Sequence, residues 1–525
     1  MKEYIVQVKD PKSWDTLHNE IINQGGGTFI PQRAVECLNE RPFNEYLAHY
    51  NLTDEEASLL QQDPRISSVE LQYLLRPGVT VGFNGTRPTY KYDQDTYYVM
   101  DDTMKNWGLW RCTNKGNNFG VEYINNGNRY INANYTYDLD GTGVDIVIVD
   151  TGVEPGHPEF AVNADGTGGS RVIDFDWHSL GVPGTATGPS INGYLGDVDG
   201  HGSNVASIAA GNTCGWASGA HIYSIRVDLN NGSTDIFNRQ TKGFINLDIV
   251  FDLIKAFHLK KIADGNFRPT IVNASWGASI TGVVGVDSVV WRGTTYDSAN
   301  SFNCGLLNTS NIPGTIGYLN TSVDVCSNSG VIIVAAAGNN SWKAEKPYGI
   351  DYNNYFVETT TNDHLYYHRG STPSNANSTI SVGAMNAGNI GGLDSIVYYS
   401  VKGSIIDIWA PGRAIMGAYS SATYVFAALP DPRNSRYFLN KIDGTSQATP
   451  QVTGYLACIL QSRKNMTTKE AKVFLSSYAE PNLADYQPTA NDFGLYNHAY
   501  KLFNSPNAIL NMPFNGPIRG TITKT

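Results

Sequence analysis

The sequence predicts an α/β protein: a doubly wound, mostly parallel sheet with helices on both faces, preceded by a small α+β unit. Between about residues 106 and 502, β-branched runs alternate with helical patterns, in the order VDIVIVD, SNVASIAAG, HIYSIRV, LDIVFDLIKAFHLKK, TIVNASWG and GVIIVAAAG. Apolar strands that alternate with helices are typical of a parallel sheet covered on both faces. A chain of 525 residues is long enough for one large and one small domain.

The first 78 residues predict the small unit. YIVQV alternates like a strand, SWDTLHNEII has helical spacing, TDEEASLLQQD opens with a capping box, and ISSVELQYLL is again extended. A polar, Tyr-rich stretch with Pro and Gly follows and predicts a linker or exposed arm. We therefore divide the chain into four parts: residues 1–78, a linker or processing region 79–105, the large domain 106–502, and a C-terminal tail 503–525.

Two stretches of the large domain interrupt its alternating pattern. Residues 278–329 and 342–377 are rich in Gly, Asn, Ser and Tyr and have weak periodicity. Long segments of this kind inside a compact domain are usually surface loops. We therefore expect both stretches to be surface insertions.

Composition and charge indicate a globular chain and disfavour binding to polyanions or membranes. Hydrophobic residues make up 41% and charged residues 16%, and the formal net charge is -11, which disfavours nucleic acid as a partner. No run approaches the ~18 apolar residues of a membrane span, and the charges in MKEYIVQVKD do not fit a signal peptide. We expect no nucleic-acid or membrane partner, and a protein that is cytoplasmic, delivered by a non-Sec route or part of an assembly.

The cysteines do not predict a metal centre. Six of them are scattered along the chain without the spacing of metal ligands. Reduced thiols are favoured, and a disulfide between Cys304 and Cys326 is the alternative.

An acidic residue ends the first apolar strand of the large domain. In IVIVDTGVEPGHPEF, Asp150 follows four apolar residues and precedes a turn that contains glycine. Open α/β sheets place their sites at the carboxyl ends of their strands. Taken alone, such an aspartate is structural or a metal ligand about as often as it is catalytic.

Two further candidates stand where a helix begins. In DVDGHGSNVASIAAG, His201 lies between two glycines, which let a backbone approach a substrate closely. In DGTSQATPQVTGYLACIL, Ser446 lies at a helix start, where free N–H groups and the helix dipole favour negative charge. Alone, each is more often a helix cap or a satisfied polar group. Together with Asp150 they follow one of the chain orders in which the Ser-His-Asp triad recurs.

These three segments resemble the motifs of the subtilisin-like serine proteases, the subtilase or S8 family. DTGVEPGHPEF is similar to the Asp motif of that family, DGHGSNVASIAAG to its His motif and DGTSQATPQVTGYLA to its Ser motif. The resemblance implies a subtilisin-like fold and a serine endopeptidase that works through an acyl-enzyme. The chain departs from the family at Ser203, Asn204, Gln447 and Gln451, where Thr, His, Met and His are common, which concerns the subfamily and the pocket rather than the chemical step.

The resemblance also implies a fourth chemical residue and a substrate-binding edge. VIIVAAAGNNS resembles the strand and turn whose Asn supplies the side-chain half of the oxyanion hole, here Asn339. A fixed amide N–H and the Ser446 N–H can stabilise the charge of a tetrahedral intermediate. NASWGAS resembles the edge strand that lines the S1 pocket and pairs with an extended substrate. The substrate-binding candidates are Ser275, Trp276, Gly277, Ala337 and Gly338.

The N-terminal unit resembles the inhibitory propeptide of the same family. QDPRISSVELQYLLRP is similar to the end of such a propeptide, and NWGLWRC is similar to the start of a mature enzyme. We expect a zymogen whose strand ISSVELQYLL extends into the cleft and which cuts itself between Leu71 and Lys105. A permanently attached accessory domain is the alternative. The expected partners are polypeptide substrates and the chain's own propeptide.

No cofactor is required for this chemistry, although structural calcium is frequent in the family. The loops GDVDG and YDLDGTG offer carboxylates without an EF-hand pattern, so we assign no metal ligands.

Two other functions compete with the protease. A non-catalytic scaffold that kept the fold is motivated by the long Asn/Gly/Tyr insertions, and the presence of all four chemical residues weighs against it. An esterase would need a G-x-S-x-G elbow, which GTSQA lacks.

Overall fold

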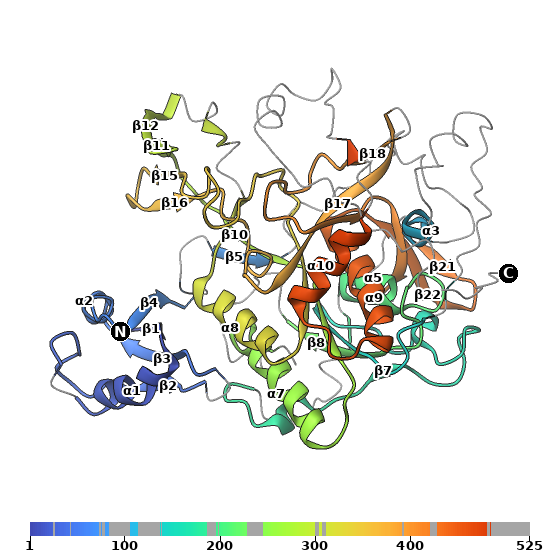
Figure 1. Ribbon diagram of the computed structural model, residues 1–525, viewed down its shortest axis with the longest axis horizontal. Coiled ribbons are helices and arrows are strands. Elements are labelled where there is room, and N and C mark those ends of the chain that lie inside the picture. The colour runs from blue at the N-terminus through green and yellow to red at the C-terminus, as the bar shows by residue number, and fades with distance from the viewer. Residues whose placement is uncertain are drawn as a thin grey trace.

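We describe the chain from a computed structural model of residues 1–525 (Figure 1). The residues described are 1–24, 27–41, 44–72, 75, 79–82, 106–113, 137, 139–185, 196–197, 199–227, 245–299, 304–306, 311–390, 393–420, 428–479 and 483–484. The expected tail 503–525 and residues 83–105 of the expected linker lie outside this part of the chain.

A nine-stranded sheet forms the centre of the large domain, in the order β23-β18-β17-β14-β9-β6-β8-β7, with β19 also paired to β17. The strands from β17 to β7, and β19, pair in parallel, whereas β18 is antiparallel to β17. This arrangement confirms the predicted doubly wound, mostly parallel sheet. The bounds are β6 Asp145–Asp150, β7 Val172–Ile173, β8 His221–Arg226, β9 Thr270–Ala274, β14 Ile332–Ala336, β17 Thr379–Ile390, β18 Leu393–Ile396, β19 Ile408–Pro411 and β23 Leu483–Ala484.

Helices cover both faces of this sheet (Figure 1). The alternation of side chains along β6 shows the two layers, because successive residues of a strand point to opposite faces. Ile146 and Ile148 pack in the core shared with α5 and α9, and Val147 and Val149 pack in the core shared with α7 and α8. The helices are α5 His201–Ala210, α7 Val250–Ala263, α8 Gly317–Asn328, α9 Thr445–Ser462 and α10 Thr468–Tyr478.

The N-terminal unit is an antiparallel sheet, in the order β2-β3-β1-β4, with helices α1 and α2. The predicted strand, two helices and final strand are present, and α2 begins with the predicted capping box at Thr53. The sequence did not predict β2 and β3, because β2 spans three residues and β3 is almost continuously buried and so lacks alternation. The bounds are β1 Lys2–Val8, α1 Trp14–Ile22, β2 Cys37–Asn39, β3 Leu47–Leu52, α2 Asp54–Leu60 and β4 Ile66–Leu71.

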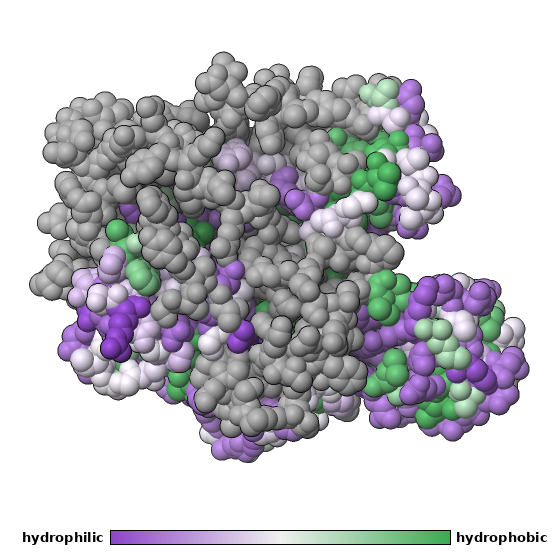
Figure 2. Space-filling model, turned by 180° about the vertical axis from the view of Figure 1, so that it is seen from behind, coloured by the Kyte–Doolittle hydropathy of each residue, from purple (hydrophilic) through white to green (hydrophobic). Residues whose placement is uncertain are grey.

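This unit packs against α7 and α8 (Figure 1), and from behind it forms a distinct lobe with a largely hydrophilic outer surface (Figure 2). The contact is polar and buried at its centre. Nε of Arg41 donates to the Asp252 carboxylate of α7 at 2.5 Å, and the two side chains are 0% and 2% exposed. Glu70 accepts the N–H of Gly317 at 3.2 Å, at the N-terminus of α8, where the helix dipole favours a carboxylate.

A short strand that the sequence analysis placed in the linker lies on the large domain. β5, Val79–Gly82, pairs antiparallel with β10, Gly277–Ile280, with Gly82 opposite Gly277 and Val79 opposite Ile280. The expectation that ISSVELQYLL would enter the cleft is therefore wrong, because residues 66–71 of that segment pair with β1 in the N-terminal sheet. The chain reaches β10 only after this sheet is complete.

The two expected insertions contain more regular structure than a surface loop. Together they form an antiparallel sheet in the order β12-β11-β15-β16, and the first also contains β10, β13 and core helix α8. Helix α8 escaped prediction because polar Asn, Thr, Ser and Asp interrupt its apolar residues. The remaining bounds are β11 Val286–Trp291, β12 Thr294–Asp297, β13 Ile312–Pro313, β15 Tyr355–Glu358 and β16 His364–Tyr366.

Two further observations bear on the sequence analysis. Within the described ranges, no helix combines the length and apolarity that crossing a bilayer requires. No disulfide joins Cys304 to Cys326, and both residues are buried.

Candidate active site

Asp150 and His201 form the centre of the site. Asp150 ends β6 and is 0% exposed, and His201 is the first residue of α5. Nδ1 of His201 donates to Oδ1 of Asp150 at 2.9 Å, so Nε2 is the ring nitrogen that can take up a proton. Burial lowers the pKa of His201, but the charge and hydrogen bond of Asp150, together with the carboxylates of Asp199 and Asp197, raise it above the ordinary value. The pair is therefore a base held in one orientation.

Ser446 is the second residue of α9, at the same carboxyl edge of the sheet. Its Oγ donates to the backbone oxygen of Ser275 at 3.0 Å, and Oγ of Ser275 donates to the backbone oxygen of Ser446 at 2.9 Å. This reciprocal contact ties the helix start to the segment between β9 and β10. The Ser446 hydroxyl thus donates to Ser275 in this structure, whereas the proposed reaction needs it to donate to His201. Hydrogen bonds of a catalytic site often change in this way when the substrate binds.

Asn339 follows β14 and lies beside the start of α9. Its Oδ1 accepts from the backbone N–H of Thr445 at 2.8 Å and from the Thr445 hydroxyl at 2.9 Å. Because the oxygen is engaged, the amide nitrogen is left to donate elsewhere, and it lies near Gly444. The arrangement provides an N–H donor next to Ser446.

The backbones of the five substrate-binding candidates lie at this edge, but not every side chain points to it. Trp276 is 2% exposed and packs in the core beside Phe251, with ring centroids 6.5 Å apart. Only its backbone can therefore serve a substrate. Ser275 and Gly277 flank it where β10 begins, and Ala337 and Gly338 follow β14.

Two of the positions where the chain departs from the subtilase motifs, Asn204 and Gln447, contact each other. Nε2 of Gln447 donates to Oδ1 of Asn204 at 3.1 Å, which joins α9 to α5 one turn from His201. Nε2 of Gln451 donates to Oδ1 of Asn106 at 3.0 Å. The first of these hydrogen bonds connects the two helices that carry His201 and Ser446, and the second connects α9 to the residue before helix α3, Trp107–Thr113.

The Asp197 carboxylate of the loop GDVDG, considered above for calcium, is engaged within the protein. It accepts the N–H groups of Asp199, Gly200 and Ser203 and the hydroxyl of Thr151. These four donors compete with a cation for its lone pairs. Across the described part of the chain, no group of three or more His, Cys, Asp or Glu could hold a metal ion.

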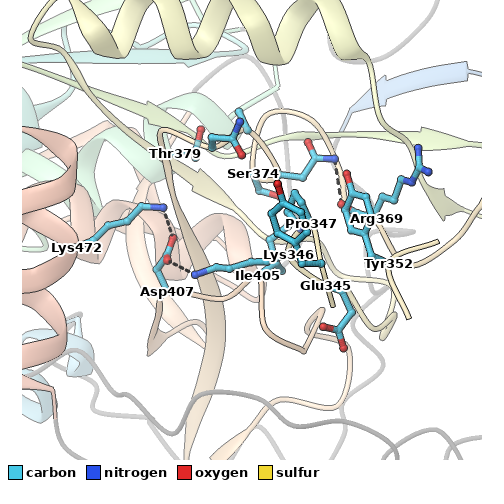
Figure 3. Close-up of a pocket in the computed structure, with 14 residues that line it drawn as sticks. Glu345, Lys346, Pro347, Tyr352, Arg369, Ser374, Thr379, Ile405, Asp407 and Lys472 are labelled. Atoms are coloured by element: carbon cyan, nitrogen blue, oxygen red, sulfur yellow. Dashed lines mark hydrogen bonds and ion pairs between the residues drawn. The ribbon is translucent and has the colours of Figure 1, made fainter. Parts of the chain in front are cut away.

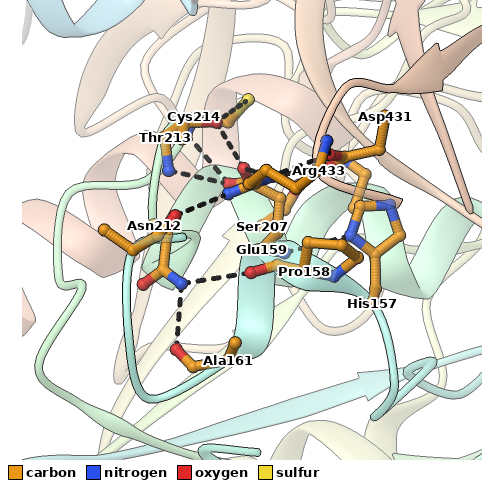
Figure 4. A network of polar contacts seen from close by, with 12 residues as sticks. His157, Pro158, Glu159, Ala161, Ser207, Asn212, Thr213, Cys214, Asp431 and Arg433 are labelled. Atoms are coloured by element: carbon orange, nitrogen blue, oxygen red, sulfur yellow. Dashed lines mark hydrogen bonds and ion pairs between the residues drawn. The ribbon is translucent and has the colours of Figure 1, made fainter. Parts of the chain in front are cut away.

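A buried ionic cluster lies at the C-terminal end of α5, the end opposite His201 (Figure 4). Glu159 is 0% exposed and accepts the backbone N–H groups of Thr213 and Cys214, both at 3.0 Å. It also pairs with Arg433 at 2.5 Å, on the hairpin of β21 Leu429–Asp431 and β22 Asn434–Ile442. Burial alone raises the pKa of Glu159, but Arg433 and the Thr213 hydrogen bonds outweigh it and lower the pKa to about 2.

A cavity of about 440 Å³ between the loop around Tyr348 and α10 contains none of the candidate residues (Figure 3). Its Asp407 carboxylate pairs with Lys346 at 3.4 Å and with Lys472 at 3.0 Å, so its charge is compensated within the protein. The edge around His201 and Ser446 is therefore the better candidate for chemistry.

Sequence reasoning missed the roles of Thr151, Asp197 and Thr445, which contact the candidate residues or the segments that carry them. Thr445 could be suspected as the neighbour of Ser446. The contact of Thr151 with Asp197 spans 46 residues of sequence, and a local pattern carries no signal for it.

Comparisons with known proteins identify the family of the chain. The model of the subtilase family, Peptidase_S8, matches residues 141–497. The "Extracellular serine proteinase" of Thermus sp. (strain Rt41A) is 25% identical over 462 residues, 88% of this chain and 74% of that protein. The "Alkaline serine exoprotease A" of Vibrio alginolyticus is 24% identical over 484 residues, 91% of this chain and 64% of that protein.

A solved structure shares the fold. The crystal structure of fervidolysin from Fervidobacterium pennivorans, described as a keratinolytic enzyme related to subtilisin, has a TM-score of 0.52 and 17% identity. The match covers 97% of this chain and 60% of that one.

The same comparisons overturn the expectation of a cytoplasmic protein. The Thermus relative is named an extracellular enzyme, and a relative from Arthrobotrys oligospora, 24% identical over 373 residues, is named a cuticle-degrading serine protease. The charged residues near Met1 argued only against one kind of leader peptide, so they could not establish a location.

Proposed function

This chain belongs to the subtilase family of serine endopeptidases, and on that premise we propose that Asp150, His201 and Ser446 are its catalytic triad, with Asn339 in the oxyanion hole. The observation that carries the proposal is the buried hydrogen bond from His201 Nδ1 to Asp150 Oδ1, at 2.9 Å. It fixes the tautomer that a general base needs.

In the proposed reaction, Ser446 attacks the carbonyl carbon of the scissile peptide bond and His201 Nε2 takes the proton of its hydroxyl. The oxygen of the broken double bond carries negative charge, which the Asn339 amide N–H and the Ser446 backbone N–H stabilise. His201 then gives its proton to the leaving amine. Water hydrolyses the acyl-enzyme with His201 again as the base.

We propose that polypeptide substrates bind as an extra strand on β10. The support is β5, which already pairs with this strand and runs toward Ser275, whose backbone oxygen accepts the Ser446 hydroxyl. Main-chain pairing with an edge strand gives affinity without requiring a particular side chain. The proposed contacts are the backbones of Ser275, Trp276 and Gly277, with Ala337 and Gly338 on the other side of the cleft.

The N-terminal unit is, in this proposal, an inhibitory propeptide that the enzyme removes itself. Two observations support it: the buried polar contact of the unit with α7 and α8, and the pairing of β5 with β10. A strand on the substrate edge competes with any substrate that uses the same edge.

The proposed chemistry needs no cofactor. Structural calcium stays a hypothesis without ligands, and thermal melts of the Ser446→Ala protein with calcium and with EDTA test it. A melting temperature that falls in EDTA and returns with calcium would support a calcium site.

A fluorophosphonate probe tests the triad directly. We expect it to label the wild type and not Ser446→Ala. Ser462→Ala is the matched control, because Ser462 is an exposed serine on the same helix whose hydroxyl donates to Ile459 at 3.1 Å. If the wild type is not labelled even after the N-terminal unit has been removed, the chain is a non-catalytic member of the family.

A further inference from the structure

The proposed chemistry leaves unused a buried carboxylate close to the triad. Asp197 is 2% exposed and stands four residues before His201. Its Oδ1 accepts the N–H of Asp199 at 3.0 Å and the N–H of Gly200 at 2.8 Å, and its Oδ2 accepts the N–H of Ser203 at 2.8 Å. Asp197 therefore binds the backbone on both sides of His201.

These contacts replace a cap that α5 lacks. The first N–H groups of a helix have no partner within the helix, and a side chain at the N-cap usually satisfies one of them. Here the N-cap is Gly200, which has no side chain, so the donors are satisfied from outside. Ser203 donates to Asp197, and Gly202 donates to the Thr151 hydroxyl at 2.9 Å.

Thr151 links this cap to the end of β6. Its hydroxyl donates to Oδ1 of Asp197 at 2.9 Å. Its backbone N–H donates at 2.8 Å to Oδ1 of Asp150, the same oxygen that accepts from His201. The first turn of α5 and the end of β6 are thus joined through Asp197 and Thr151 as well as through the Asp150–His201 bond.

The first turn of α5 and the turn after Asp150 are in direct backbone contact, with no side chain between them. A Cβ at Gly202 would lie 1.9 Å from the backbone oxygen of Gly152, so the helix start rests directly on the turn that follows Asp150. A shift of the first turn of α5 would therefore move His201 relative to Asp150.

We propose that Asp197, acting through the Thr151 hydroxyl, is a positioning residue of the triad, which holds the first turn of α5 so that His201 faces Asp150. The inference rests on the proposed function and assigns Asp197 no contact with the substrate. A misplacement of catalytic groups by about 1 Å can cost ~10² in rate, so the effect should fall on kcat.

The charge of Asp197 provides a readout that helix capping alone would not give. Burial lowers the pKa of His201, while the carboxylates of Asp150, Asp199 and Asp197 raise it, and together they outweigh burial. Removing the Asp197 charge should lower the pKa of His201 and shift the acidic limb of the activity profile to lower pH.

Asp197→Asn tests the proposal against Asp165→Asn. Asp165 is exposed and also accepts a backbone N–H and a hydroxyl, both from Thr167, at 3.0 and 2.6 Å, but it touches no candidate residue. With enzyme concentration set by fluorophosphonate titration, we expect Asp197→Asn to lower kcat about 10- to 100-fold, to change KM less than about twofold and to shift the acidic limb down. Asp165→Asn should match the wild type in all three.

A second pair keeps the test decisive if Asp197→Asn does not fold. Thr151→Val removes the hydroxyl link at nearly constant volume, and Thr151→Ser restores it. We expect a loss of kcat in the valine variant and recovery in the serine variant. Full kcat and an unmoved acidic limb in Asp197→Asn, or equal kcat in both Thr151 variants, would overturn the positioning role. Hydrolysis by Ser446→Ala would instead show that the proposed triad itself is wrong.

Discussion

Thr445 holds the side-chain oxygen of Asn339 from two directions, with its backbone N–H at 2.8 Å and its hydroxyl at 2.9 Å. A carboxamide whose oxygen is engaged twice cannot flip without losing both hydrogen bonds. The amide nitrogen is therefore preorganised as a donor before substrate binds. Such preorganisation is what an oxyanion hole requires.

Asn339→Ala should lower kcat by ~10²–10³ and leave KM nearly unchanged, because only the transition state carries the oxyanion charge. The protein should stay folded with a lower melting temperature, because the buried N–H and hydroxyl of Thr445 lose their acceptor. The adjacent Asn340→Ala is the control, since the Asn340 side chain donates to the backbone oxygen of Asn311 at 2.7 Å. Steady-state kinetics on a peptide substrate measure both. An Asn339→Ala enzyme with unchanged kcat would remove this residue from the site.

Asp150→Asn should cost about 10⁴ in kcat while the protein stays folded, because an amide favours the wrong tautomer of His201. The raised pKa of His201 means that its imidazole stays protonated, and therefore inactive as a base, up to a higher pH. We expect kcat/KM of the wild type to fall as pH drops, with a midpoint above the ordinary His pKa of about 6.5. In Asp150→Asn, the midpoint of the residual activity should move to lower pH. A full-rate variant would place the triad acid elsewhere.

Several parts of this site could be predicted because local pattern and sheet geometry agree. Asp150 ends a buried strand of the parallel sheet, where open α/β sheets place their sites, and His201 and Ser446 lie at the starts of α5 and α9, which pack on one face of that sheet. What escaped prediction depends on contacts between distant segments. The sequence of GDVDG showed only that this loop offers carboxylates, because nothing in it indicates that the donors to Asp197 include Thr151.

The side-chain direction of Trp276 shows a second limit of the sequence. Resemblance placed it on the substrate edge, and the backbone is there, but the indole turns into the core with Phe251. Which face a single side chain takes at the end of a strand depends on the space left by α7, and the sequence does not reveal that space.

Glu159→Gln should lower the free energy of unfolding at neutral pH. It should also make that free energy fall less steeply as the pH is lowered. The pKa of Glu159 is about 2 in the folded chain and about 4.5 when unfolded, so its contribution is complete above pH 4.5 and is lost as pH falls toward 2. A difference of this size corresponds to about 3 kcal/mol. Urea unfolding of the Ser446→Ala protein between pH 6 and pH 3 measures it.

Glu470→Gln is the control for this experiment. Glu470 is an exposed capping-box residue that accepts the N–H and hydroxyl of Thr467 at 2.8 and 2.9 Å. Glu470→Gln should hardly change how steeply the free energy of unfolding falls between pH 6 and pH 3. Equal slopes for Glu159→Gln and the parent protein would contradict the assigned role of the ionic cluster.

Arg41→Met should weaken the hold of the N-terminal unit on the large domain once the chain between them is cut. The substitution leaves Asp252 buried without its partner, which costs about 3–5 kcal/mol, or ~10²–10⁴ in affinity. Faster appearance of activity after cleavage, and loss of co-elution on size-exclusion chromatography, would show it. Lys2→Met is the control, because the Lys2–Asp54 pair is exposed, at 50% and 59%, and lies within the unit. Identical release from both variants would mean that the Arg41 pair does not hold the unit in place.

The N-terminal unit should be removed by the enzyme itself, at a bond after Gly82 and before Asn106. Because β5 pairs with β10 up to Gly82 opposite Gly277, and runs toward the backbone oxygen that binds Ser446, the bond presented to Ser446 must follow the paired residues. Ser446→Ala should accumulate as the uncut 525-residue chain, whereas the wild type and Ser462→Ala should yield a shorter fragment. Intact mass and N-terminal sequencing of the fragment locate the cut.

Two outcomes would separate inhibition from simple attachment. If the cut unit inhibits, activity should lag behind cleavage and rise as the unit dissociates or is degraded, because β5 still occupies the substrate edge after the bond is broken. If purified wild type stays full length and is nevertheless fully active, the unit is a permanent accessory domain and β5 does not block the cleft. A cut before Val79 would also contradict the proposal, because β5 would then remain attached to the enzyme rather than to the inhibitor.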